Sequence, residues 1–201
     1  SPLAFAAGGT GSRLIYLNNC NVPDSCLLTY GPEDSRTNHS AIIDVDQGEL
    51  SPFPYSATVW NDFVQCVRET LLPFDVEVTE SDPGNVPHWE NMVAGHPNDM
   101  GMSSDIAGVS PWSGGCAVLN NTITFTYAEN HNESAYQLCW TAVQEVAHSW
   151  GLDHEMLVKS PMTYLSGQLP KRFQNVDAFC GEDQNRPCEC GPSKQNSWEY
   201  L

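Results

Sequence analysis

Eight cysteines spread along this chain of 201 residues limit the folds that it can adopt. They are Cys20, Cys26, Cys66, Cys116, Cys139, Cys180, Cys188 and Cys190. The chain has no C-x-x-C pair, so the spacing does not favour a zinc finger. An even number of cysteines is typical of secreted folds held by disulfides, here four, although about 105 pairings are open. We expect an extracellular protein in which Cys20 bonds Cys26.

The charge of the chain excludes some partners. Eight Lys and Arg against 25 Asp and Glu give a net charge of −17, which repels nucleic acid and anionic lipid. Such acidity also suits calcium sites or cationic substrates, but colloidal solubility is its commonest explanation. No apolar run approaches the roughly 18 residues of a membrane span. We expect no nucleic-acid or membrane partner, and a monomer of one domain.

The sequence of expected strands and helices favours an α+β fold that resembles the α/β class. Runs rich in β-branched and aromatic residues predict strands at 12–18, 41–45, 75–79, 88–94, 105–110 and 122–127. Apolar residues at helical spacing predict helices at 56–72 and 134–150. Residues 19–40 are typical of a long loop, and the segment after residue 151, rich in Gly, Pro and Cys, is expected to be irregular.

The most informative stretch runs from Gln144 to Glu155 and reads QEVAHSWGLDHE. On a helix, residues four apart face the same way, so Gln144 and His148 can reach one point while Glu145 flanks it. Gly151 can adopt a left-handed turn that ends the helix and returns His154 to that point. The spacing therefore predicts that three side chains converge on one metal ion.

This stretch resembles the signature of the metzincin metallopeptidases, H-E-x-x-H-x-x-G-x-x-H, through Glu145, His148, Gly151 and His154. The resemblance implies a zinc site on a helix that packs against a mixed, twisted sheet. It also implies one catalytic domain, 1–201, in which an N-terminal subdomain, 1–154, and a small disulfide-rich C-terminal subdomain, 155–201, flank a cleft.

Residues that follow the signature extend the resemblance. The sequence SPMTY at 160–164 resembles the methionine turn of metzincins, with Met162 beneath the site. Tyr164 falls where astacins and serralysins carry a tyrosine that binds the metal or stabilises the transition state. Glu155, directly after the last histidine, also matches the astacin pattern.

Gln144 stands where the family has its first histidine ligand. An amide oxygen has a similar reach to an imidazole nitrogen, but it is neutral and a poorer donor for zinc. We expect weaker metal binding by Gln144, His148 and His154. Tyr164 could add an oxygen ligand, and fewer strong donors would leave the zinc a stronger Lewis acid.

The resemblance implies peptide hydrolysis by a metal-activated water. Glu145 would act as general base and then protonate the leaving amine, and Tyr164 would stabilise the oxyanion. A protein or peptide substrate would lie extended beside the strand at 105–110. Trp112, after that strand, is a candidate for the cleft, whereas Trp140 and Trp150 are expected in the core.

Other candidate residues have simpler interpretations. Residues 44–49, DVDQGE, have the alternating carboxylates of a calcium loop but lack its final bidentate glutamate, so a plain turn is expected and calcium is the alternative. The remaining histidines, His39, His88, His96 and His131, have no partner at ligand spacing and are expected on the surface or in strands.

Two functions from different classes remain open. The first is a secreted zinc endopeptidase, which the retained Glu145 favours. The second is a pseudopeptidase that holds a protein or peptide without cleaving it, which the loss of the histidine at Gln144 favours. A third interpretation, that Gln144 was introduced to silence an active enzyme, ranks last because engineers more often change the glutamate.

Overall fold

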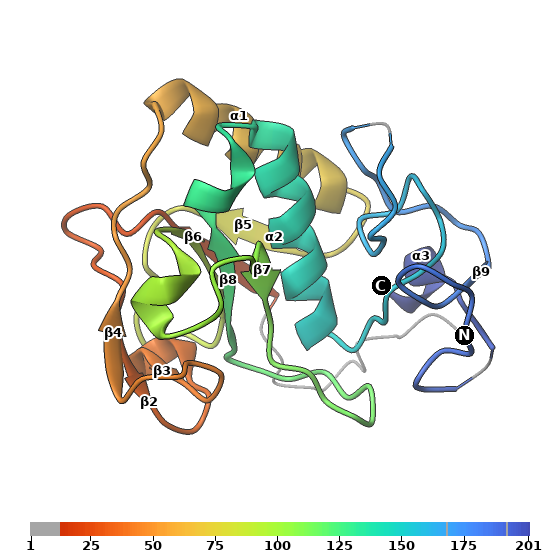
Figure 1. The fold of residues 1–201 in the computed structure, drawn as a ribbon, viewed down its shortest axis with the longest axis horizontal. Helices are drawn as coiled ribbons and strands as arrows, with labels where there is room; N and C mark the ends of the chain where they lie inside the picture. The colour runs from red at the N-terminus through yellow and green to blue at the C-terminus, as the bar shows by residue number, and fades with distance from the viewer. Residues whose placement is uncertain (1–12, 168, 192) are drawn as a thin grey trace.

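The computed structural model describes residues 13–167, 169–191 and 193–201, which form a mixed α+β fold around a five-stranded sheet (Figure 1). The strands lie in the order β5 (Glu77–Thr79), β1 (Leu14–Asn18), β6 (Trp89–Ala94), β8 (Ile123–Tyr127) and β7 (Gly108–Val109). The first four strands run parallel to one another, and the edge strand β7 pairs antiparallel with β8. The expected mixed sheet is confirmed, although the strand expected at 105–110 has only two residues.

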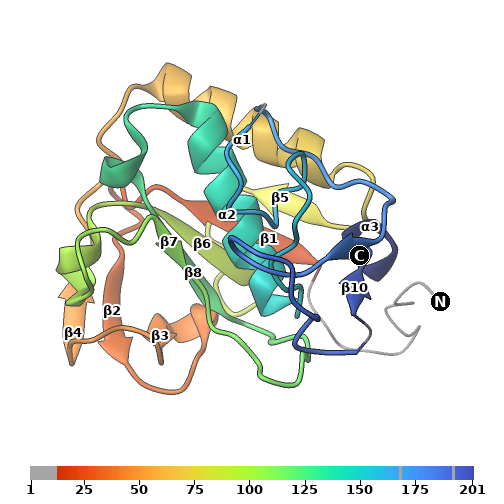
Figure 2. The same cartoon turned by 45° about the vertical axis from the view of Figure 1, so that its right-hand side comes forward.

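Two long helices confirm the helical periodicity. Helix α1 (Ala57–Leu71) begins at Ser56, whose hydroxyl accepts a hydrogen bond from the Val59 amide. Helix α2 (Ala135–Ser149) begins at Ser134 in the same way. Both helices cover one face of the sheet (Figure 2), and a disulfide between Cys66 and Cys139 joins them.

The core has two layers, one on each face of the sheet. Between the helices and the sheet, Phe63, Trp89 and Val143 belong to one buried cluster. On the opposite face, Met92 and Phe125 pack with Leu28 in a second cluster. Because apolar groups cover both faces, every residue of β6 is buried, including the polar ones.

The second layer includes a small sheet that the sequence did not predict. Its strands are β3 (His39–Ser40), β2 (Leu27–Tyr30) and β4 (Gln47–Glu49), in that order. The prediction of one loop over 19–40 is therefore wrong, and so is the strand at 41–45. The amide of Asp44 bonds instead to Met100, in the short 3-10 helix η2 (Pro97–Met100), so the segment joins no ladder.

The C-terminal segment is less irregular than expected. It holds a two-stranded antiparallel sheet of β9 (Ala178–Phe179) and β10 (Lys194–Gln195), followed by helix α3 (Ser197–Tyr200). These elements have two to four residues each, too few for periodicity to reveal them. The proposed division of the chain at residue 154 stays a prediction.

Four disulfides hold the chain, as expected from the even number of cysteines. The Cys20–Cys26 bridge is confirmed, and the others are Cys66–Cys139, Cys116–Cys190 and Cys180–Cys188. They indicate an extracellular or otherwise oxidising environment. None of the helices in the described ranges has the length and apolarity that a membrane span requires.

Candidate functional site

The end of α2 shapes the site. Gly151 has φ +96°, and a Cβ atom built there would lie 2.4 Å from the carbonyl oxygen of Cys116 and 2.7 Å from the hydroxyl of Tyr200. Only glycine combines that conformation with so close an approach. The left-handed turn predicted at this residue is confirmed, and it reverses the chain so that His154 returns to α2.

His148 and His154 face each other through their Nε2 atoms, which are 2.9 Å apart. The Nδ1 atom of His148 lies 2.7 Å from the carbonyl oxygen of Leu152, and that of His154 lies 3.0 Å from a carboxylate oxygen of Glu182. A carbonyl or carboxylate oxygen can only accept, so both Nδ1 atoms carry the proton. In the neutral rings, two Nε2 lone pairs therefore point toward one place.

The surroundings keep this arrangement of protons. Burial, together with the neighbouring His154, lowers the pKa of His148 to about 4, so its ring is neutral at physiological pH. Hydrogen bonds from Arg186 first, and from His154 second, lower the pKa of Glu182 to about 2, so its carboxylate is ionised. Two facing lone pairs repel unless a proton or a cation lies between them.

Glu145 lies three residues before His148 on α2 and borders the same cleft. Its side chain is 8% exposed, and burial raises its pKa to about 8. The edge strand holds it closely, since a Cβ atom on Gly108 would lie 2.9 Å from Cγ of Glu145. This is the environment of a carboxylate that can take and return a proton near neutral pH.

Tyr164 borders the cleft beside His154. Its ring centre lies 4.3 Å from that of His154, and the side chain is 55% exposed. Burial of the hydroxyl, then the charges of Glu145 and Glu182, raise its pKa, so the phenol keeps its proton. The hydroxyl has no hydrogen-bond partner within the described ranges and is free to donate to a bound molecule.

Gln144 is 5% exposed, and its buried amide nitrogen has no hydrogen-bond partner among the residues that the structure describes. Its side chain borders a second chamber next to the one that holds the two histidines. A buried N–H donor without a partner is costly, so this amide nitrogen is placed to donate to an acceptor on a bound molecule.

The cleft consists of two adjoining chambers, of about 280 and 460 Å³, and Gly108, Glu145 and Tyr164 border both. The first contains the histidine pair, Trp112, Asp153 and a group of charged residues from the C-terminal segment. The second lies along the N-terminal half of α2, with Trp140 and Thr141 on its wall. The catalytic candidates thus stand at the junction of the chambers.

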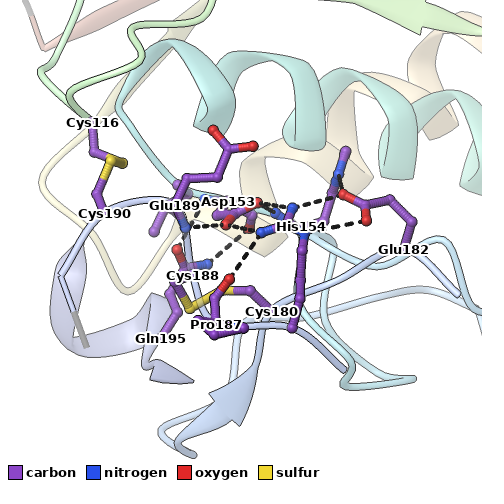
Figure 3. Close-up of polar contacts among 12 residues, drawn as sticks. Cys116, Asp153, His154, Cys180, Glu182, Pro187, Cys188, Glu189, Cys190 and Gln195 are labelled. Carbon is purple, nitrogen blue, oxygen red and sulfur yellow. Dashed lines mark hydrogen bonds and ion pairs between the residues drawn. A yellow bond between two sulfur atoms is a disulfide. The ribbon is translucent and has the colours of Figure 1, made fainter. Parts of the chain in front are cut away.

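A charged network behind His154 escaped the sequence-based predictions (Figure 3). Arg186 donates two hydrogen bonds of 2.7 Å to Asp153 and one of 2.7 Å to Glu182, which in turn accepts from His154. Glu182 and Arg186 lie in the loop that the Cys180–Cys188 disulfide closes. No motif marks them, because only the folded loop brings them to the histidine.

Other groups with metal-ligating atoms are already engaged. Asp153, Cys180 and Cys188 lie within ligand spacing, but the two sulfurs form a disulfide and are not thiolates. Asp153, His154 and Glu182 also lie close together, but Arg186 occupies both carboxylates.

The segment 44–49 was expected to be a plain turn or a calcium loop, but its second half, Gln47–Glu49, is strand β4. No three of its carboxylates come within ligand spacing among the described residues. Calcium stays a prediction without support from converging donors.

The structure also places the remaining sequence candidates. Met162 is fully buried, and its carbonyl oxygen accepts from the amide of Glu155, so the 160–164 turn lies against the residue that follows His154. Glu155 is buried and accepts a hydrogen bond from Ser197.

Two of the three tryptophans lie where the sequence predicted, and Trp140 does not. Trp112 borders the cleft and Trp150 is in the core, both as expected. Trp140 is only partly buried because it forms a wall of the second chamber, with its indole donating to Pro161.

Among the four other histidines, His131 corrects the expectation of a surface or strand position. It ends the 3-10 helix η3 (Ala128–His131), is buried, and bonds to Thr141 beside the second chamber. His88 is buried just before β6, and His39 and His96 are partly exposed.

Comparison with known proteins adds no assignment: no family model, curated protein or solved structure matches this chain.

Proposed function

We propose that this protein is a zinc-dependent peptidase of the metzincin type, whose metal lies between His148 and His154. The observation that carries the proposal is the 2.9 Å separation of two Nε2 atoms whose rings both use Nδ1 to contact an oxygen acceptor. The resemblance of the 144–164 sequence to the metzincin signature and methionine turn agrees with it.

The donor atoms fit a zinc ion. With Zn–N distances of about 2.0–2.1 Å, two tetrahedral ligands stand on the order of 3.3 Å apart, a few tenths of an ångström more than the two Nε2 atoms here. Each ring also donates its other N–H to an oxygen, as zinc-bound histidines do. Gln144, four residues before His148, is the third candidate ligand through its amide oxygen Oε1, and its side chain borders the adjoining chamber.

A bound zinc ion would polarise a peptide carbonyl and make a bound water acidic. The protein supplies the proton transfers and the orientation. Glu145 takes a proton from the attacking water and passes it to the leaving nitrogen, for which a pKa raised by burial suits it. Tyr164 donates its hydroxyl to the carbonyl oxygen as negative charge develops.

Loss of the general base tests the proposal. The protein, loaded with one equivalent of zinc, is incubated with denatured casein with and without a chelator. We expect cleavage that the chelator abolishes and that Glu145→Gln lowers by about 100-fold or more.

Glu90→Gln is the matched control, because Glu90 is also buried, has a pKa also raised to about 8 by burial, and lies in β6 outside the lining of both chambers. Cleavage that persists in Glu145→Gln would contradict the assigned base.

A pseudopeptidase is the second candidate, and the glutamine at the first ligand position favours it. In that case the cleft would hold peptides without hydrolysis and with little dependence on zinc. Capture of a peptide by the chelated protein, together with no turnover by the zinc-loaded protein, would support this function over the first.

A further inference from the structure

We infer that the site acts on the free amino terminus of a peptide, which lies against the Trp112–Glu189 end of the cleft. The inference rests on the proposed function and narrows it, since a closed end suits removal of terminal residues rather than cleavage inside a chain.

One end of the cleft is closed by a tie between two chain segments. The indole nitrogen of Trp112, in the loop after β7, donates a 3.0 Å hydrogen bond to Glu189 of the C-terminal segment. The Cys116–Cys190 disulfide joins the same two segments a few residues away (Figure 3). An extended peptide following β7 past the histidines would have to displace this covalently anchored wall.

The wall stands close to the site where bonds would be cleaved. The ring of Trp112 meets that of His148 edge-on, with centres 5.8 Å apart. Because an extended peptide advances about 3.3 Å per residue, the wall lies within about two residues of the histidine pair. The other chamber has no such tie: between its strand side, 105–108, and Tyr164, the described residues form no hydrogen bond or disulfide.

The charge at the closed end selects which terminus fits. Besides Glu145, the carboxylates of Asp153, Glu182 and Glu189 border this chamber, together with one guanidinium, that of Arg186. Arg186 is committed to Asp153 and Glu182. Glu189 forms no ion pair in the described part of the chain, so an incoming ammonium group is attracted, whereas an α-carboxylate is repelled.

The reaction then releases one or two amino-terminal residues. Water adds across the peptide C–N bond: its oxygen completes the carboxylate of the released fragment. The proton held by Glu145 completes the new amino terminus of the remaining peptide, which occupies the larger chamber beside Trp140.

Binding to an inactive variant tests the inference apart from turnover. The probes are two decapeptides of one sequence, labelled at the carboxyl end, with a free or an acetylated amino terminus. Zinc-loaded Glu145→Gln is expected to bind the free peptide up to about fivefold more tightly, since an exposed charge pair contributes up to about 1 kcal/mol. Equal affinities would overturn the inference.

Two further variants test which carboxylate causes the preference for the free amino terminus. Adding Glu189→Gln should abolish the preference, whereas Glu199→Gln, which removes the same charge outside the cleft, should preserve it. A preference that Glu189→Gln leaves unchanged would overturn the assignment to this end.

Turnover by the wild-type protein separates this inference from the proposed function. Loss of one or two residues from the free peptide alone supports both, and Trp112→Ala should then admit the acetylated peptide. Internal cleavage of both peptides would leave the peptidase proposal standing and overturn this inference. Selective binding without any turnover would contradict the peptidase proposal while supporting recognition of the amino terminus.

Discussion

The imidazole of His154 donates from Nδ1 to the carboxylate of Glu182, 3.0 Å away. Arg186 donates a 2.7 Å hydrogen bond to the same carboxylate oxygen, so two partners fix the position of this carboxylate. A carboxylate in this place orients the ring and makes Nε2 a better donor, which is the usual support of a metal-bound histidine.

Removing that support should weaken metal binding. We expect Glu182→Ala to lower zinc affinity by about 10- to 100-fold and Glu182→Gln by less, because glutamine can still accept the hydrogen bond. Competition with a chromophoric chelator measures the affinity, and Glu199→Gln serves as control. An unchanged affinity of Glu182→Ala would exclude His154 as a ligand.

Restoring the first histidine should strengthen the site. In Gln144→His, an imidazole replaces a neutral amide at the third candidate position, so zinc affinity is expected to rise at least about tenfold, or about 1.4 kcal/mol. The same titration measures it. Gln65→His, on the exposed face of α1, adds a histidine far from the cleft and should change nothing. No gain at position 144 would show that this residue does not face the metal.

The turn at Gly151 should tolerate no side chain. Gly151→Ala would place a methyl group 2.4 Å from the carbonyl oxygen of Cys116 in a left-handed conformation. We expect a loss of at least about 2 kcal/mol in the free energy of unfolding, measured with urea, and weaker zinc binding. Gly114→Ala, where an added Cβ has no neighbour within 4 Å among the described residues, is the matched control. Equal stability of the two variants would contradict this role of Gly151.

Glu90 should make the fold less stable as pH rises. Burial raises its pKa from 4.5 to about 8 in the folded protein, so the folded state binds the proton more tightly than the unfolded state. The stabilisation is complete below about pH 4.5 and is lost as pH rises toward 8, by on the order of a few kcal/mol.

Urea unfolding at pH 5 and pH 8 checks this prediction. From pH 5 to pH 8, Glu90→Gln should lose less free energy of unfolding than the wild type, because glutamine does not ionise. The exposed Glu77→Gln should follow the wild type. If Glu90→Gln lost as much free energy of unfolding as the wild type between the two pH values, the effect would belong to other groups.

Much of the framework follows from local pattern. The periodicity of α1 and α2, the buried strands β1, β6 and β8 and the Gly151 turn were readable because each depends on residues near one another in sequence. The even number of cysteines gave four disulfides, and the short loop gave the Cys20–Cys26 pair, but nothing local distinguished the pairings of the other six.

Only the tertiary structure decided the environment of the site. Glu182, Arg186 and Glu189 lie in a loop without periodicity, and they reach His154 and Trp112 because the Cys180–Cys188 and Cys116–Cys190 bridges fold that loop back on the cleft. The spacing from Gln144 to His154 is a property of one helix and one turn, so sequence reveals it. The charge, burial and closed end of the cleft arise from contacts between residues far apart in the chain, and no local pattern encodes them.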